Sequence, residues 1–185
     1  MKYKKPETLK NKSRPKTSRQ LLETLNKIEI IYDTQHHLPM YTVSESKEFR
    51  GTPKPGAYTK NLFLRNKKGS MWLVTCCEDS NLDLQSVSNQ LQSGRLSFSS
   101  IDRLKQFLGV LPGSVSPFAL INDSTLSVSF VMEKRLLQYK TIHLHPLDNT
   151  QTITISTEDF LRFLSYIQHT PNYIEFTLDE NKQTN

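Results

Sequence analysis

The stretch that decides the fold is Tyr58–Gly69, which reads YTKNLFLRNKKG. Leu62 and Leu64 fall on one side of an extended chain and Phe63 on the other, an alternation typical of a β-strand. The closing residues NKKG favour a turn, because glycine adopts a positive φ at no steric cost. A second apolar run, MWLVTCC (Met71–Cys77), follows directly. The sequence therefore predicts a β-hairpin.

Lys60 and Asn61 stand where a loop rich in glycine and proline, Gly51–Ala57, leads into the first strand of this hairpin. A lysine at the mouth of a strand is well placed to act on a substrate that lies over the edge of a sheet. By itself Lys60 is more simply an ordinary solvated lysine, because long cationic side chains are mostly exposed. The rest of the chain must decide between these interpretations.

Four motifs follow one another in the chain: KNLFLRNKKG, LSFSS (Leu96–Ser100), PGSVSPFALIND (Pro112–Asp123) and HPLDNTQT (His145–Thr152). Together they resemble the prolyl-tRNA editing family, the YbaK/ProRS-associated domain group, and most of all its freestanding Ala-tRNA(Pro) deacylases. The resemblance extends from Thr17 to Pro171. Four motifs in a fixed order are far more specific than any one of them. The resemblance implies a partly closed mixed sheet with an open substrate pocket.

The length and the pattern of elements agree with this expectation. A chain of 185 residues suffices for one domain with a real core. Candidate strands outnumber candidate helices and do not alternate strictly with them, which favours the α+β class. We expect a single domain, residues 20–175, with a mixed, curved, partly barrel-like sheet and packed helices. A basic disordered tail, residues 1–19, would precede it, and a polar tail, residues 176–185, would follow.

Local patterns predict the boundaries of the other elements. Capping-box patterns at Thr17, Ser99 and Ser156 indicate helix starts, and a short helix is expected from Ser44. The second of these helices is expected to stop at Gly109. A further helix is predicted over Leu82–Gln92. The remaining strands are predicted at Lys27–Asp33, Phe118–Asn122, Leu126–Glu133, Tyr139–His145 and Thr150–Ser156.

The positive charge is concentrated at one end of the chain. Of the charged residues among positions 1–19, eight are cationic and only Glu7 is acidic, while the whole chain carries +6. The remainder is therefore almost neutral. A basic arm gains affinity for nucleic acid by releasing counterions. It serves equally well as a solubilising tail. A mitochondrial transit peptide is less favoured, because the arm lacks an apolar face.

Apolar runs and cysteines bear on the location of the protein. We expect neither a membrane span nor a signal peptide, because no long apolar stretch is present. Cys76 and Cys77 are adjacent and cannot build an ordinary disulfide framework. We therefore expect a cytoplasmic protein.

Two histidines are spaced as in some metal sites, but the sequence offers no evident third ligand. His143 and His145 are two apart on a predicted strand and face the same way. A third ligand is not evident, because His36 and His37 are expected on a distant loop. No glycine-rich phosphate cradle or Ser–His–Asp pattern is present either. We expect no metal and no cofactor, so a lysine, backbone amides and water would perform the chemistry.

The resemblance implies roles for particular residues. Lys60 would be catalytic, as a charge or less plausibly as a base, with Asn61 beside it. The other substrate-binding residues would be Gly113, Ser114, Val115, Ser116 and His145, with Met40 and Thr42 setting the size of the pocket. Leu38, Met40 and Tyr41 depart from the proline, valine and phenylalanine usual in the family. Methionine in place of valine leaves the choice of amino acid open, because it could narrow or reshape the pocket.

The expected function is trans-editing, the hydrolysis of alanine from mischarged tRNA(Pro). A synthetase pocket that fits proline cannot strongly exclude the smaller alanine, so a second site removes the error. The expected partners are tRNA and, beyond it, prolyl-tRNA synthetase. One alternative is a deacylase for another small amino acid, serine or cysteine. Another is a non-catalytic tRNA-binding or synthetase-associated module.

Overall fold

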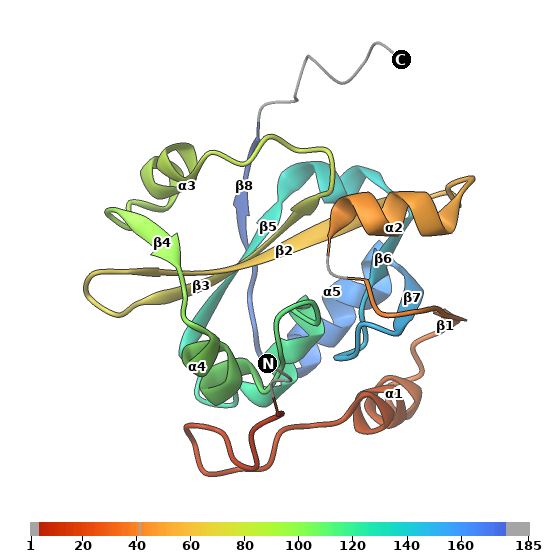
Figure 1. Cartoon of the computed structure of the whole chain (residues 1–185), viewed down its shortest axis with the longest axis horizontal. Coiled ribbons are helices and arrows are strands. Elements are labelled where there is room, and N and C mark those ends of the chain that lie inside the picture. Colours follow the sequence, from red (N-terminus) through yellow and green to blue (C-terminus); the bar gives the residue numbers. More distant parts are fainter. Residues whose placement is uncertain (1–3, 41, 177–185) are drawn as a thin grey trace.

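A mixed β-sheet runs through the molecule, and helices pack against it (Figure 1). The computed structural model describes residues 4–40 and 42–176. The strands are β1 (Tyr32–His36), β2 (Ala57–Asn66), β3 (Met71–Cys77), β4 (Leu96–Phe98), β5 (Val128–Glu133), β6 (Thr141–Leu144), β7 (Gln151–Ser156) and β8 (Asn172–Ile174). The helices are α1 (Ser18–Lys27), α2 (Val43–Arg50), α3 (Leu84–Leu91), α4 (Ile101–Arg103), which a π-helical turn over Leu104–Leu108 continues, and α5 (Thr157–Tyr166).

The strand order is β1-β7-β6-β2-β3-β5-β8, with β4 paired to the far end of β2. The hairpins β2–β3 and β6–β7 are antiparallel, whereas β6 pairs with β2, β5 with β3 and β8 with β5 in parallel. Both the predicted hairpin and the predicted α+β class with a mixed sheet are confirmed.

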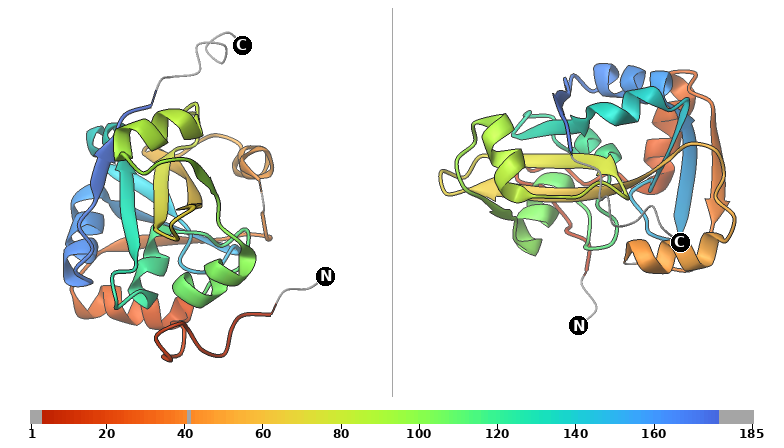
Figure 2. Two further views of the ribbon diagram at one scale, coloured as in Figure 1. Left: turned by 90° about the vertical axis from the view of Figure 1, so that its left-hand side faces the viewer. Right: turned by 90° about the horizontal axis from the view of Figure 1, so that it is seen from above.

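The sheet bends where β2 meets β6. Only Ala57 and Tyr58 of β2 pair with β6, opposite Ile142 and His143. The rest of β2 turns away and pairs with β3 and β4. Figure 2 shows the result from above, with β1 and β7 running across the direction of β2 and β3. The bend leaves the first residues of β2 at a corner between the two halves of the sheet.

The central strands are buried on both faces. Phe63 and Leu73 belong to the larger apolar cluster, whereas their neighbours Leu64 and Val74 belong to a second, smaller one. Helices α1 and α5 contribute to the larger cluster, and α3 contributes Val87 to the smaller. Successive side chains along each strand therefore point into two different apolar cores, whereas in a sheet with one solvent-exposed face they would alternate between core and solvent.

The N-terminal residues depart from the expected free tail. Leu9 is only 6% exposed. The backbone N–H of Lys10 donates to the Gln106 carbonyl (2.7 Å), and that of Lys16 donates to Asn122 Oδ1 (2.8 Å). One buried apolar side chain and these hydrogen bonds hold residues 4–17 against the domain. The expected polar tail, residues 176–185, lies almost wholly outside the described residues.

Two strand predictions were wrong. Of the segment Lys27–Asp33, only Tyr32 and Asp33 belong to a strand, because α1 continues to Lys27 and β1 begins at Tyr32. Phe118–Asn122 lies within a 3-10 helix, Pro117–Asn122. The Ser116 hydroxyl accepts the Phe118 N–H at its start, and a proline at the first helical position suits helical backbone.

The helix starts are closer to prediction. The capping box at Thr17 with Gln20 is present. Ser156 caps α5 by accepting the Asp159 N–H (3.0 Å). The prediction at Ser99 is wrong by one residue, since the neighbouring Ser100 caps α4. No helix among the described residues is long and apolar enough to cross a membrane.

Candidate active site

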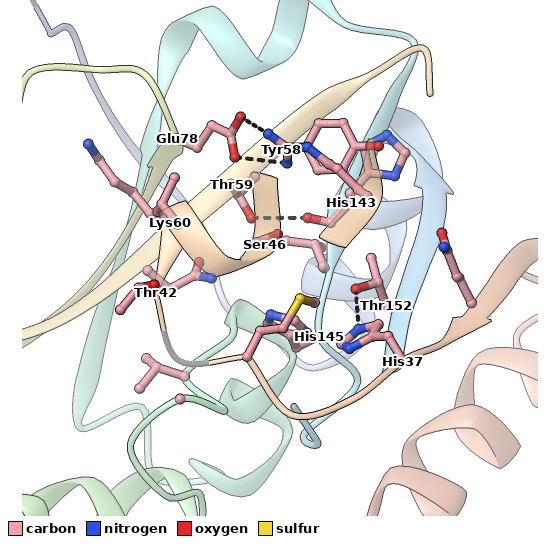
Figure 3. A pocket seen from close by; sticks show the side chains of 18 residues that line it. His37, Thr42, Ser46, Tyr58, Thr59, Lys60, Glu78, His143, His145 and Thr152 are labelled. Atoms are coloured by element: carbon pink, nitrogen blue, oxygen red, sulfur yellow. Dashed lines mark hydrogen bonds and ion pairs between the residues drawn. The ribbon is translucent and has the colours of Figure 1, made fainter. Parts of the chain in front are cut away.

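A pocket of about 220 Å³ lies at the corner of the sheet (Figure 3). Its lining comes from β1, the segment that leads into α2, α2 itself, the first half of β2, β6 and the loop around Gly113. Seven of the residues predicted for the site line it: Met40, Thr42, Lys60, Asn61, Gly113, Val115 and His145.

The other two predicted residues, Ser114 and Ser116, are buried and do not line the pocket. The Ser116 hydroxyl accepts the Phe118 N–H (3.3 Å) and caps the following 3-10 helix. The Ser114 N–H donates to the Leu111 carbonyl (2.9 Å). These contacts hold the loop around Gly113 in place, and the predicted role of the two serines in substrate binding stays a prediction.

Lys60 lies near the start of the β2–β3 ladder, in the second pair, opposite Cys76. Its ammonium group donates a hydrogen bond to the backbone carbonyl of Ser80, in the turn that follows β3. Figure 3 shows the Lys60 side chain at the edge of the labelled group, pointing away from His37 and His145. An ammonium group has three N–H donors, so two remain for other partners.

A buried carboxylate fixes the turn that receives Lys60. Glu133, at the end of β5, is 1% exposed, and its Oε2 accepts both the Cys77 N–H (2.7 Å) and the Ser80 hydroxyl (2.7 Å). Arg135 balances its charge, with Nε 3.2 Å from Glu133 Oε1. The same guanidinium pairs with Asp79, and although burial opposes ionisation there, Arg135 lowers the pKa of Asp79.

The thiols near this network are inert. Burial raises the pKa of Cys76 to about 12, against the opposing charge of Lys60. Burial likewise raises the pKa of Cys77 to about 12. Because the thiolate is the nucleophilic form of cysteine, neither residue can serve as a nucleophile near neutral pH.

The opposite side of the pocket is formed by α2. Thr42 caps this helix, since its hydroxyl accepts the Glu45 N–H (3.1 Å) and the Glu45 carboxylate accepts the Thr42 N–H (3.3 Å). No described residue of α2 is buried. The helix therefore contributes little apolar surface to the core, and its place depends on polar contacts.

Those contacts gather at Arg50, the last residue of α2. Its guanidinium donates two hydrogen bonds to the Glu78 carboxylate. It also lies over the Tyr58 ring, 3.8 Å from the centroid. Tyr58 in turn stacks on His143, with centroids 4.1 Å apart. This stack joins α2 to β2 and β6.

His145 and His37 form the remaining polar side of the pocket, with ring centroids 5.9 Å apart. Burial lowers the pKa of His145, and its Nδ1 lies 2.8 Å from the Gln151 carbonyl. A carbonyl only accepts, so Nδ1 carries the proton of the neutral ring and Nε2 is the acceptor. His37 hydrogen bonds to Thr152 Oγ1 through Nε2 (2.9 Å).

The expectation that His37 lies on a distant loop is wrong. Pairing of β1 with β7 brings it beside the loop that follows His145, where its N–H donates to the Thr150 carbonyl (2.9 Å). Tyr58, Arg50 and Glu78 also line the pocket without having been predicted. No local signal marks them, because their contacts join separate elements. Within residues 4–40 and 42–176, no three metal-binding side chains come together.

A profile of the aminoacyl-tRNA editing domain matches residues 37–163, which is more than half of the chain. Of the helices and strands, α1, β1 and β8 lie outside this match. The chain therefore belongs to the aminoacyl-tRNA editing domain family and is an enzyme of the aminoacyl-tRNA hydrolase class.

Two relatives that match over most of their own length show which group of the family this chain belongs to. The prolyl-tRNA editing protein ProX of Acetoanaerobium sticklandii is 34% identical over 156 residues, which cover 84% of this chain and 94% of that protein. The prolyl-tRNA synthetase associated domain-containing protein 1 of Danio rerio is 34% identical over 160 residues, 85% of this chain and 86% of that protein. Within the editing family, the chain belongs to the prolyl-tRNA editing group.

A solved structure supports the same fold. A protein described as a candidate trans-editing enzyme for prolyl tRNA synthetase superposes with a TM-score of 0.64 over 88% of this chain and 98% of that one. Its sequence identity is 13%, so the likeness concerns the fold alone.

Proposed function

We propose that the chain is a trans-editing deacylase that hydrolyses alanine from mischarged tRNA(Pro). The observation that carries the proposal is the pocket of about 220 Å³, with Lys60 on one side and Met40 and Val115 among its apolar lining residues. We assign the choice of amino acid to these apolar residues, because a second sieve selects its substrate by the size of the side chain. The substrate is tRNA, and prolyl-tRNA synthetase is a further proposed partner.

The reaction needs little more than positioned charge and water. Water attacks the ester carbonyl carbon, the bond from that carbon to the ribose oxygen breaks, and the proton of the water ends on that oxygen. Alanine and tRNA leave. Negative charge develops on the carbonyl oxygen in the tetrahedral intermediate, and donors that face it lower the barrier.

Two sets of donors adjoin the pocket. Lys60 supplies an ammonium group that keeps two N–H donors beyond the one given to Ser80. The loop of Gly113 supplies backbone amides. Gly113 has φ 87, where a side chain would be strained, so glycine lets this backbone face the pocket. The Ser114 amide is engaged by Leu111, and we assign the oxyanion to the amides of Gly113 and Val115.

Asn61 orients the substrate beside Lys60. Its Oδ1 accepts the Thr75 hydroxyl (2.7 Å), which leaves the amide NH₂ as the group that can donate into the pocket. We assign Lys60 the role of a fixed positive charge, because its ammonium group donates to a neutral carbonyl and, among the described residues, forms no ion pair with a carboxylate.

The test is single-turnover hydrolysis of tRNA(Pro) charged with alanine, serine, cysteine or proline. We expect rapid loss of alanine and retention of proline. Faster loss of serine or cysteine would assign the enzyme to that amino acid instead. Equal hydrolysis of all four would refute the sieve, and binding without hydrolysis would indicate a non-catalytic module.

Three lysine variants complete the experiment. Lys60→Ala should be slower by about a hundredfold or more, because it removes a preorganised charge, and it should melt like the wild type. Lys60→Arg keeps the charge and should retain measurable activity. Lys67→Ala, at the exposed β2–β3 turn, is the matched control and should behave as wild type. A dead arginine variant would instead favour Lys60 as a base.

A further inference from the structure

Residues 4–17, here called the basic strap, form an ordered segment along the outside of the domain. Leu9 anchors it, with 6% of its surface exposed. Around Leu9 the chain makes a closed turn, in which the Lys12 N–H donates to the Leu9 carbonyl (3.0 Å) and the Leu9 N–H to the Ser13 carbonyl (2.8 Å). The Asn11 side chain reaches Ser124 Oγ (2.9 Å). The strap therefore holds a defined path.

This path adjoins both loops that border the pocket. A Cβ on Gly109 would lie 2.6 Å from Pro15 Cβ, so the strap packs directly on the chain four residues before Gly113. The Lys5 ammonium group donates to the Leu147 carbonyl (3.3 Å), two residues after His145. Figure 1 shows the strap running from the front of the molecule to its lower side, beneath the α4 region.

The strap exposes cations that the protein itself does not neutralise. Lys4, Lys10, Lys12, Arg14 and Lys16 are all exposed. Among the described residues, no carboxylate lies within ion-pair distance of any of these five. By contrast, Arg19 pairs with Glu23 (2.9 Å). Because the rest of the chain is almost neutral, the strap supplies nearly all of its net positive charge.

We propose that the basic strap binds the sugar–phosphate backbone of the tRNA acceptor stem. The proposal rests on the proposed function, since it takes the charged 3′ end of the tRNA to lie in the pocket. The stem must then leave past the rim, where the strap meets the pocket loops. Phosphates neutralise the crowded cations and release counterions. A membrane surface fits less well, because the one apolar anchor, Leu9, is turned into the protein.

The binding test removes charge and keeps the fold. The strap variant combines Lys10→Gln, Lys12→Gln, Arg14→Gln and Lys16→Gln and retains Leu9. The control combines Lys67→Gln and Lys68→Gln at the exposed β2–β3 turn, at the other end of β2 from the pocket. Circular dichroism melting should be alike for both. Uncharged tRNA(Pro) binding is followed by fluorescence anisotropy over a range of salt concentrations.

For the strap variant we expect affinity to fall about tenfold or more at low salt. The slope of log affinity against log salt should flatten by about 0.7–0.9 for each phosphate that the strap no longer neutralises. The control should match the wild type. An unchanged slope would leave the strap as a solubilising segment and overturn the proposal. An equal loss of affinity in the control, or tight binding of wild type to anionic vesicles that tRNA does not displace, would overturn it as well.

A kinetic test separates this proposal from the proposed function. On Ala-tRNA(Pro), the strap variant should raise KM and leave kcat within about twofold, because it removes contacts made equally in ground and transition states. On alanyl-adenosine, which has no stem, it should equal the wild type. Wild type that binds tRNA through the strap but hydrolyses no ester would refute the proposed function alone. Normal KM in the strap variant would refute the strap alone.

Discussion

Two carboxylates near the pocket, Glu133 and Glu78, are each paired with an arginine, but only Glu78 lines the pocket. Glu133 is 1% exposed and belongs to what we call the floor of the pocket. The floor consists of the end of β3, the end of β5 and the turn whose Ser80 carbonyl accepts the Lys60 ammonium group. It meets a backbone N–H, a hydroxyl and Arg135. The Glu78 side chain is 15% exposed and meets Arg50 and, at 3.8 Å, Lys47, both from α2.

The difference shows how one pocket combines a fixed and an adjustable side. The Glu133 network joins three segments of the sheet and determines where the Lys60 ammonium group can lie. The Arg50–Glu78 pair holds a helix that buries none of its described residues. Changes in the floor should therefore affect folding and catalysis, whereas changes at α2 should affect the substrate that the pocket accepts.

The largest expected effect is at the floor. Glu133→Gln removes a buried charge from beside Arg135, and we expect a loss of about 3 kcal/mol in the free energy of unfolding, as for other broken buried pairs. Urea denaturation followed by circular dichroism measures it. Glu23→Gln, which breaks the exposed α1 pair with Arg19, is the control and should change stability by less than about 0.5 kcal/mol. Similar costs for the two variants would contradict the contrast.

A smaller effect is expected at α2. Glu78→Gln leaves Arg50 with its ring contact and a weaker acceptor, so stability should fall by only about 1 kcal/mol. The position of α2 would loosen, and we expect KM for Ala-tRNA(Pro) to rise severalfold with kcat nearly unchanged. Steady-state kinetics measures both constants. If kcat falls instead and KM stays constant, α2 does not control substrate fit.

The smallest expected effect is on the pH dependence of stability, and it comes from His143 in the stack with Tyr58 and Arg50. Burial lowers the pKa of His143, with Arg50 and Lys54 adding to the shift and Pro55 and Glu78 opposing it. The unfolded chain therefore binds the proton more readily, and stability falls as pH drops below about 6.5.

His143 should contribute about 1 kcal/mol or less of the loss in stability between pH 7 and pH 5.5. Urea midpoints of wild type and His143→Gln at the two pH values measure this share. His145 and His169, whose pKa values burial also lowers, remain in the variant and contribute to the loss in both proteins. An identical pH dependence in the two proteins would exclude His143 as a contributor.

Local patterns in the sequence predicted those elements that depend on interactions between residues close together in the chain. The hairpin follows from alternation in Tyr58–Gly69, and the starts of α1 and α5 follow from capping residues at Thr17 and Ser156. The strand predicted at Phe118–Asn122 was wrong, because apolar residues in a tightly packed 3-10 turn are as buried as those in a strand. β4 and β8, each three residues long, carry too little pattern to be recognised.

The site was predictable only where a family motif marked it. Lys60, Asn61 and the Gly113 loop come from such motifs, and the structure brings them to one pocket. His37 and Arg50 reach the pocket through pairing of β1 with β7 and through docking of α2, which no short window of sequence encodes. The strap was misjudged as a free tail because one buried leucine among many charges gives a weak signal.

The two-residue parallel pairing of β2 with β6 also bears on the order of folding. It joins Ala57 to Ile142, across roughly 85 residues of intervening chain, whereas the hairpins β2–β3 and β6–β7 close over short loops. Distant closure carries a larger entropic cost and is slow, so both hairpins should form before the corner between them. A chain emerging from the ribosome therefore carries Lys60 long before it has a pocket, and activity should appear only when β6 arrives.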